Sequence, residues 1–251
     1  MSAPIGIIGG TALAELAGIE EARRAARVNT PYGRPSGPLI HGRLAGRDVC
    51  FIMRHGPEHR IAPHRINYRA NIRALADAGC HQVIAASAVG GISQPMRAGR
   101  LVIPDQIIDY SWGRAHSFYD DPSDATLDHI DFTTPYAPQL RRQLIQSAAS
   151  IGLDFAAEGV HAVTQGPRLE TAAEVERMAR DGCDIVGMTG MPEAALAREA
   201  GLFYACCAVV VNAAAGRSDG APIHAEIRTT IKQGMADIER LLRAVIPTLQ
   251  G

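Results

Sequence analysis

Hydroxyl side chains, an arginine and glycine-rich turns follow several apolar, strand-like runs of the sequence. Thr11 follows "IGIIGG", Arg54 follows "VCFIM", Ser87 follows "VIAA" and Thr189 follows "DIVGM". Glycines let a backbone approach an anion closely, hydroxyls donate hydrogen bonds to it, and an arginine can bind it bidentately. In the open sheets of α/β proteins, ligands bind at the carboxyl ends of the strands. The pattern therefore predicts a phosphate pocket at this edge of a sheet.

Two further polar residues stand after other strand-like runs. Glu170 lies in "TQGPRLET", and Asn212 ends "AVVVN". A carboxylate and a carboxamide would add an acceptor and a donor–acceptor beside the phosphate. Each residue also has an architectural interpretation: Glu170 can favour a helix N-terminus, Asn212 can begin a turn, and Thr189 can cap a helix. The convergence of these residues at strand ends favours a site.

Composition excludes several classes of protein. The 25 basic and 26 acidic residues nearly balance, which argues against a nucleic-acid binder. Five cysteines without C-x-x-C spacing indicate neither zinc nor a disulfide framework, and fit a reducing cytoplasm. The longest apolar stretch, 202–211, is too short to cross a bilayer, which takes about 20 residues.

Other catalytic motifs are missing or do not fit. Residues 55–59, "HGPEH", match the inverted zinc-protease pattern H-x-x-E-H. That pattern needs a helix, which Gly56 and Pro57 disfavour, so we expect no metal site. The sequence has no G-x-S-x-G elbow and no P-loop lysine. A phosphate pocket in this setting suggests that phosphate is a reactant.

The elements that must position these residues alternate along the chain. Strand-like runs that are apolar on both faces alternate with helical stretches that end on glycines. This order predicts one α/β domain, residues 1–251, with a mixed, largely parallel sheet flanked by helices. The expected strands lie within 5–10, 48–56, 82–91, 100–109, 159–167, 183–188 and 204–212, and the expected helices within 67–79, 134–152, 170–182, 191–201 and 225–246.

Seven segments together resemble the trimeric purine nucleoside phosphorylase and methylthioadenosine phosphorylase family. They are "IGIIGGT", "TPYGRPS", "RHG", "NYRANI", "QGPRLET", "GMTGMPEAALARE" and "VVN", and they are spread along most of the chain, from Ile5 to Asn212. The resemblance implies a phosphorylase fold, a homotrimer or hexamer, phosphate as co-substrate, and no metal or organic cofactor. The implied reaction converts a purine nucleoside and phosphate into a free base and a pentose 1-phosphate.

The resemblance also implies roles for individual residues. Ser87 stands where methylthioadenosine phosphorylases usually have threonine, and it keeps the hydroxyl. His129 matches a residue that the family lends to the neighbouring subunit's site. The phosphate ligands would be Thr11, Arg54, His55, Ser87, Ala88 and Thr189; the nucleoside contacts Leu169, Glu170, Met188, Asn212, Ala214, His224 and His129; and the catalytic groups Asn212, Glu170 and His55.

The same comparison predicts which purine is bound. Methylthioadenosine phosphorylases place an aspartate at the position of Asn212 and another at Ala214, with serine near Glu170. Glu170 can accept from the N1–H of a 6-oxopurine, and Asn212 can donate to O6 and accept from N7–H. A buried mismatch leaves polar groups unpaired, which would disfavour adenine.

The 5′ group of the sugar leaves two alternatives. His224 lies where purine nucleoside phosphorylases have a histidine that binds a 5′-hydroxyl, which favours inosine and guanosine. S-methyl-5′-thioinosine follows closely, with S-methyl-5′-thioadenosine behind it. A non-catalytic nucleoside-binding protein is a remote second class, since such a protein has no need of a phosphate site.

Overall fold

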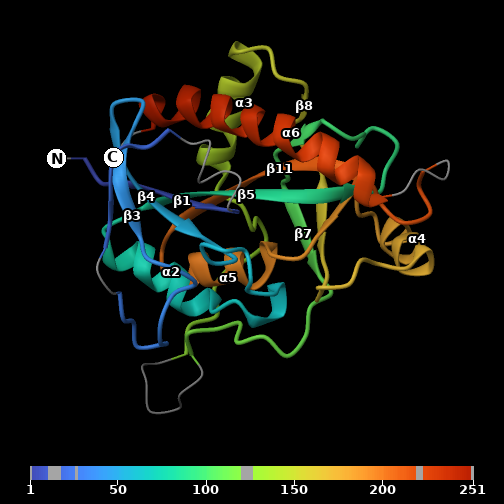
Figure 1. Cartoon of the computed structure of the whole chain (residues 1–251). Coiled ribbons are helices and arrows are strands. Elements are labelled where there is room, and N and C mark those ends of the chain that lie inside the picture. The colour runs from blue at the N-terminus through green and yellow to red at the C-terminus, as the bar shows by residue number, and fades with distance from the viewer. Residues whose placement is uncertain (1, 11–17, 26–27, 120–126, 219–222, 250–251) are drawn as a thin grey trace.

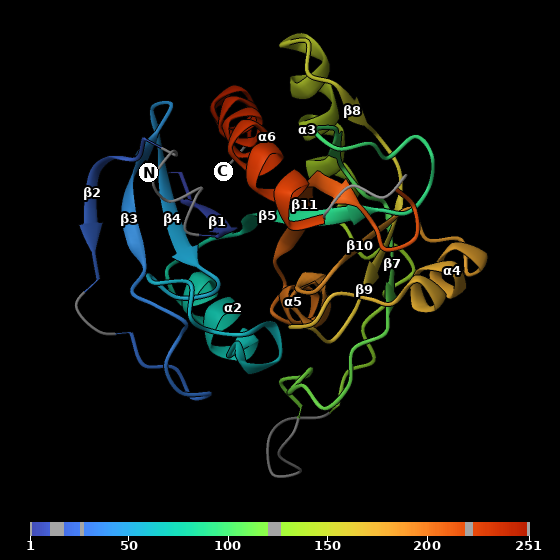
Figure 2. The same ribbon diagram turned by 45° about the vertical axis from the view of Figure 1, so that its right-hand side comes forward.

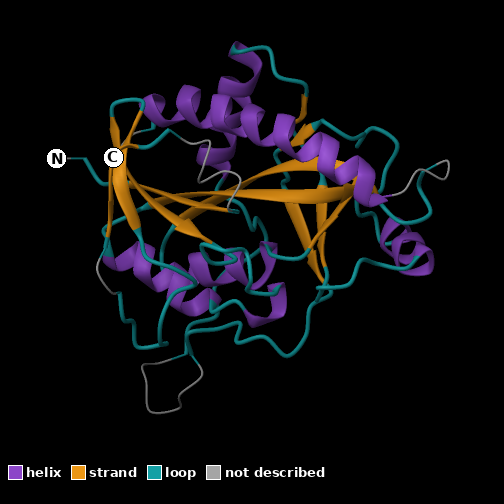
Figure 3. Cartoon of the chain, viewed as in Figure 1, coloured by secondary structure: helices purple, strands orange, loops and turns teal. Residues whose placement is uncertain are grey.

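A mixed β-sheet runs through the middle of the molecule and carries helices on both faces (Figures 1 and 3). The computed structural model describes residues 2–10, 18–25, 28–119, 127–218 and 223–249, except for the side chains of 223–226, 228 and 229. In this part of the chain, no helix is long and apolar enough to span a bilayer.

The strands are paired mainly in parallel, as predicted. Six of the ten strand pairings are parallel, including those that join β1 to both β4 and β5 and β5 to β11. The strands are β1 (Ile5–Gly9), β2 (Glu20–Arg24), β3 (Ile40–Leu44), β4 (Arg47–Met53), β5 (Gln82–Gly91), β6 (Leu101–Val102), β7 (Gln106–Asp109), β8 (Phe155–Ala156), β9 (Val160–Val163), β10 (Ile185–Gly187) and β11 (Phe203–Ala213).

The described residues form five α-helices that pack around the sheet, and all five were predicted. In Figure 1, α3 and α6 lie above the sheet and α2 and α5 below it. The glycines expected after the first four helices, Gly79, Gly152, Gly182 and Gly201, all have positive φ, the conformation of a helix-ending C′ residue. The helices are α2 (Tyr68–Asp77), α3 (Pro138–Ser150), α4 (Ala172–Arg180), α5 (Gly190–Glu199) and α6 (Ile223–Val245), with short 3-10 turns at Pro63–Arg65 and Ile246–Thr248.

Strand β11 shows why the central runs are apolar on both faces. Cys207 and Val209 pack with α3 and α6, whereas Cys206 and Ala208 pack with α2 and α5. Helix α6 comes very close to this strand at Gly234, where an added Cβ would collide with the side chain of Val209. The helix is therefore pressed directly onto the sheet.

Two of the polar residues lie within strands and not beyond them. Ser87 follows the apolar run 83–86 but lies inside β5, which ends at Gly91 as the expected range 82–91 does; Asn212 ends the expected range 204–212, and β11 continues one residue further, to Ala213. The ends of both strands are paired. Gly90 and Gly91 of β5 pair with β10 in antiparallel orientation, and Asn212 of β11 pairs with Gly90. Because backbone pairing continues past the apolar runs, these polar side chains lie within the sheet.

Strands β2 and β3, at the edge of the sheet in Figure 2, were not predicted. Every residue of β2, with the sequence EEARR, is exposed. A strand without a buried face leaves no apolar alternation in the sequence, so β2 could not be recognised.

Candidate functional site

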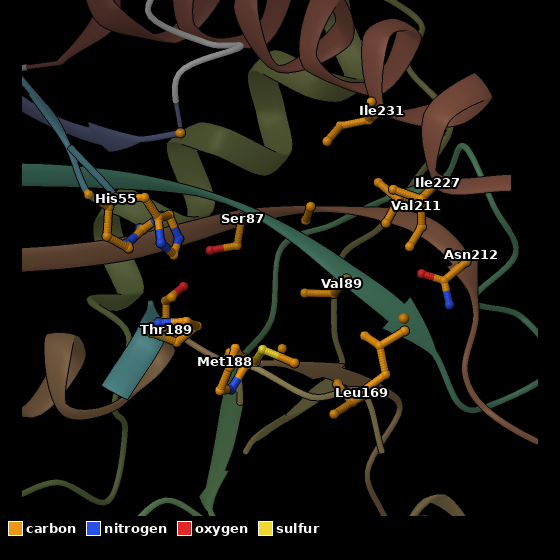
Figure 4. A pocket seen from close by; sticks show the side chains of 18 of the residues that line it. His55, Ser87, Val89, Leu169, Met188, Thr189, Val211, Asn212, Ile227 and Ile231 are labelled. Carbon is orange, nitrogen blue, oxygen red and sulfur yellow. The ribbon is translucent and has the colours of Figure 1, made fainter. Parts of the chain in front are cut away.

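A cavity of about 660 Å³ lies between α6 and the strands β4, β5, β10 and β11. Figure 4 shows His55, Ser87 and Thr189 at one end, Asn212 at the other, and Met188 and Leu169 along one side. The structure brings ten predicted residues together in its lining: Arg54, His55, Ser87, Ala88, Leu169, Glu170, Met188, Thr189, Asn212 and Ala214.

Three predicted residues are not placed in the cavity. Thr11 lies outside the described residues, although its neighbour Gly10 lines the cavity. His224 belongs to α6, but its side chain is outside the description. His129 is exposed and is not among the described residues that line the cavity, so its role at a neighbouring subunit stays a prediction.

The end of the cavity near His55 has the donors of an anion site. Ser87 and Thr189 are buried except toward the cavity, and come from β5 and from the start of α5. Thr189 is the N-cap residue of α5, but its side chain makes no capping hydrogen bond. Thr189 therefore does not cap the helix through its side chain, which was the alternative interpretation of the sequence. Its hydroxyl can instead form a hydrogen bond with a ligand.

Arg54 differs from the prediction because it is already paired. Its Nε and Nη2 donate to Glu193 at 2.7 and 2.8 Å, and its Nη1 donates to the carbonyl of Ala86 at 2.9 Å. Burial alone would lower the pKa of Arg54, but the charge and hydrogen bonds of Glu193 raise this pKa overall. Three of its five N–H groups thus hold the protein together, and the other two can reach an anion.

His55 is neutral at physiological pH. Burial, followed by the nearby charge of Arg54, lowers its pKa to about 4, against the opposing effect of its hydrogen bond to Ile61. Its Nδ1 lies 2.8 Å from the carbonyl of Ile61, which can accept but not donate. The ring proton is therefore on Nδ1, and Nε2 is an acceptor that suits a protonated phosphate oxygen or a hydroxyl.

Glu170 and Asn212 occupy the other end of the cavity. The Glu170 Oε1 atom accepts from the hydroxyl of Thr164 at 2.6 Å. Asn212 Nδ2 donates to the carbonyl of Ala213 at 2.6 Å, and the amide has a second N–H and an oxygen for a ligand. The β11–β5 register shifts between Val210 and Asn212, so Val211 and Asn212 both line the cavity. Neighbouring residues of a regular strand would face opposite sides, and a β-bulge removes this restriction.

Sequence reasoning missed an apolar wall formed by four side chains. Ile227, Ile231 and Met235 of α6 line the cavity together with Val211, and Figure 4 shows Val211, Ile227 and Ile231. The three helix residues are four positions apart, so they lie along one side of α6. Their spacing is visible in the sequence, but an apolar stripe facing a ligand has the same pattern as one facing the core.

Arg114 was also missed, although it joins the loops that carry the site. It donates to the carbonyls of Thr164 and Gln165 after β9 and to those of Met188 and Met191 after β10. Because these four partners are carbonyl groups of the backbone, no residue type in the sequence marks them. This arginine fixes the positions from which Glu170, Met188 and Thr189 enter the cavity.

The zinc-protease pattern does not form a helix, as expected. Residues 55–59 form consecutive turns. Among the described residues, no group of three or more His, Cys, Asp or Glu side chains could hold a metal ion.

Replacing Arg114 by lysine should weaken the site and the fold. The lysine ammonium group lacks the planar fork of a guanidinium, so several backbone carbonyls would lose their hydrogen-bond donor. We expect the free energy of unfolding to be about 1.5–3 kcal/mol lower than in wild type. Urea denaturation measures this change. The matched control is Arg73→Lys, because Arg73 forms an exposed ion pair with Asp77. Its free energy of unfolding should stay within about 0.5 kcal/mol of the wild-type value. Equal losses in the two variants would contradict the role of Arg114.

His55 should make the fold less stable in acid. Its pKa falls from 6.5 in the unfolded chain to about 4 in the fold, so the unfolded chain binds more protons between these values. The stability associated with neutral His55 is complete above pH 6.5 and is lost as pH falls toward 4. Urea denaturation at pH 7 and pH 5 measures this change. Between these two pH values, the free energy of unfolding should fall less in His55→Gln than in wild type. An identical pH dependence would refute this assignment.

Comparison with known proteins agrees with this geometry. The model of the phosphorylase superfamily matches residues 4–247. A protein of Pseudomonas syringae pv. tomato named "Probable S-methyl-5'-thioinosine phosphorylase" is 51% identical over 241 residues, which cover 96% of this chain and 97% of that protein. The "6-oxopurine nucleoside phosphorylase" of Pyrococcus furiosus is 42% identical, over 98% of this chain and 92% of its own length.

A solved structure has the same fold. The methylthioadenosine phosphorylase of Schistosoma mansoni in complex with tubercidin superposes with a TM-score of 0.89, at 30% identity, covering 98% of this chain and 91% of that one. The fold, the arrangement of the cavity and these matches lead to one conclusion: the chain belongs to the phosphorylase superfamily.

Proposed function

We propose that the protein is a purine nucleoside phosphorylase whose preferred substrate is S-methyl-5′-thioinosine. One observation carries the choice of sugar: Val211, Ile227, Ile231 and Met235 give the cavity an apolar wall where α6 and the end of β11 line it. A methylthio group gains free energy on leaving water for such a wall, whereas a 5′-hydroxyl would lose hydrogen bonds there. This reverses the order of the two alternatives that the sequence favoured.

The residues of the chain suit a direct displacement. Phosphate held by His55, Ser87 and Thr189 attacks C1′ of the sugar while the bond from C1′ to purine N9 breaks. The bonding electrons leave with the purine, and the negative phosphate stabilises the positive charge that develops on the sugar. The departing base takes up, on its imidazole ring, the proton that hydrogen phosphate loses, so the products are neutral hypoxanthine and 5-methylthioribose 1-phosphate.

The departing base gains negative charge, and the far end of the cavity can stabilise it. Asn212 can donate to O6 and accept from N7–H, while Glu170 accepts from N1–H. Adenine presents an amino group at C6 and a lone pair at N1, which oppose this arrangement. The proposal of a 6-oxopurine base therefore rests on two side chains that line the same end of the cavity.

Inosine and guanosine form the second candidate pair of substrates. The observation in their favour is the position of His224, which precedes Ile227 of the apolar wall by one helical turn. A 42% identical relative is named for 6-oxopurine nucleosides without a methylthio group. Inosine has the same base as methylthioinosine and differs from it at the 5′ group alone, and guanosine has a different 6-oxopurine base.

A substrate panel tests the proposal. Methylthioinosine, inosine, guanosine, methylthioadenosine and adenosine are each incubated with and without phosphate, and release of the base is measured. We expect phosphate-dependent release with the highest kcat/KM for methylthioinosine. An adenine nucleoside at or above its inosine counterpart would overturn the choice of base. Absence of phosphate-dependent release from every compound would favour a binding protein.

The apolar wall can be tested by one substitution. Ile231→Asn places a polar group against the methylthio carbon, and we expect kcat/KM for methylthioinosine to fall about tenfold or more, with a smaller loss for inosine. Lys232→Asn, at an exposed position of the same helix, is the matched control and should leave both values unchanged. If Ile231→Asn lowers kcat/KM equally for both substrates, the apolar wall does not select between the two 5′ groups.

A further inference from the structure

We propose that Thr164 is a positioning residue that makes Glu170 selective for 6-oxopurines. The inference deepens the proposed function and rests on it. Thr164 follows β9 directly, and its hydroxyl lies 2.6 Å from Glu170 Oε1. Within the described part of the chain, this is the one hydrogen bond that the Glu170 side chain makes.

The threonine hydroxyl is committed to Glu170. It has a single proton, and its other nearby acceptor, the carbonyl of Gly187, lies at 3.4 Å. A hydrogen bond from O–H to a carboxylate is strongest at the shorter of these two distances. The carboxylate is therefore held by Oε1, and Oε2 is the oxygen that can serve the base.

The backbone of Thr164 is fixed on both sides. Its N–H donates to the carbonyl of Gly187 at 2.9 Å, which continues the β9–β10 ladder. Its own carbonyl accepts from Arg114 at 2.9 Å. A β-branched side chain on a fixed backbone has few rotamers, so the hydroxyl is an ordered donor.

A neighbouring cation, Arg168, is paired mainly with another carboxylate. Arg168, two residues from Glu170, is held by Glu174 through hydrogen bonds of 2.8 and 2.7 Å. The second pocket, of about 300 Å³, is lined by Thr164, Arg168 and Glu174, and it shares Glu170 with the main cavity. Glu170 thus stands between two cavities, and Thr164 supports it from the smaller one.

This arrangement bears on the choice between the two kinds of purine. A carboxylate anchored through one oxygen presents the other as an acceptor, which matches the N1–H of hypoxanthine or guanine. The N1 of adenine is itself an acceptor, so two lone pairs would face each other. Without the hydroxyl of Thr164, the carboxylate could rotate away or take up a proton, and adenine would be rejected less strongly.

The experiment measures kcat/KM for methylthioinosine and methylthioadenosine in wild type, Thr164→Val and Thr164→Ser. Valine keeps the shape and removes the donor; we expect the ratio of the two values to fall about tenfold or more. Serine keeps the donor and should preserve most of the ratio. Thr189→Val is the matched control at the opposite end of the cavity, where the KM for phosphate should rise without a change in the ratio.

The ratio is measured on the same folded enzyme, so a loss of folded protein does not affect it. If Thr164→Val does not fold, Thr164→Ala is measured in its place; if a variant is inactive, calorimetric affinities for hypoxanthine and adenine supply the ratio. A ratio within twofold of wild type in the valine or alanine variant overturns the inference. So does a serine variant that loses as much selectivity as valine. A wild-type enzyme that prefers methylthioadenosine refutes the proposed function itself, whatever the variants do.

Discussion

The buried ion pair between Arg54 and Glu193 is the interaction on which the site depends most. Glu193 lies on α5 and accepts from Arg54, at the end of β4, through both carboxylate oxygens; Tyr204 of β11 donates to it at 2.8 Å. Arg54 also donates to the carbonyl of Ala86 in β5. One buried cluster thus joins three strands and a helix beneath the anion end. Removing one partner of such a pair commonly costs about 3–5 kcal/mol, because the other charge stays buried.

The two ends of the cavity are built on different principles. At the anion end, the charge of Arg54 is balanced by Glu193, so hydrogen bonds from Ser87 and Thr189 must supply much of the attraction for phosphate. At the base end, a hydrogen bond from Thr164 holds Glu170. The first end is a rigid, neutral framework that exposes donors, and the second offers an acceptor of defined orientation.

Much of this arrangement could be predicted from the sequence, because the chemistry is tied to strand ends and strand ends are marked by apolar runs. The glycines that end four helices gave the helix boundaries, and the residue types of Arg54, His55 and Thr189 indicated an anion. Prediction failed where a feature depends on long-range geometry. The partner of Arg54 is 139 residues away, and most partners of Arg114 are backbone carbonyls, which no residue type marks. The bulge at Val211 and the face that α6 turns to the cavity both follow from packing.

The tight contact between Gly234 and Val209 has a consequence for how such an enzyme can change over evolution. A helix pressed so closely onto β11 cannot shift to enlarge or reshape the cavity without breaking the core behind it. A new preference at the 5′ position must then arise by exchange of side chains on a stationary backbone. Ile227, Ile231 and Met235 are the positions available. Relatives with different sugar preferences can thus share one scaffold and diverge through very few substitutions along one helix.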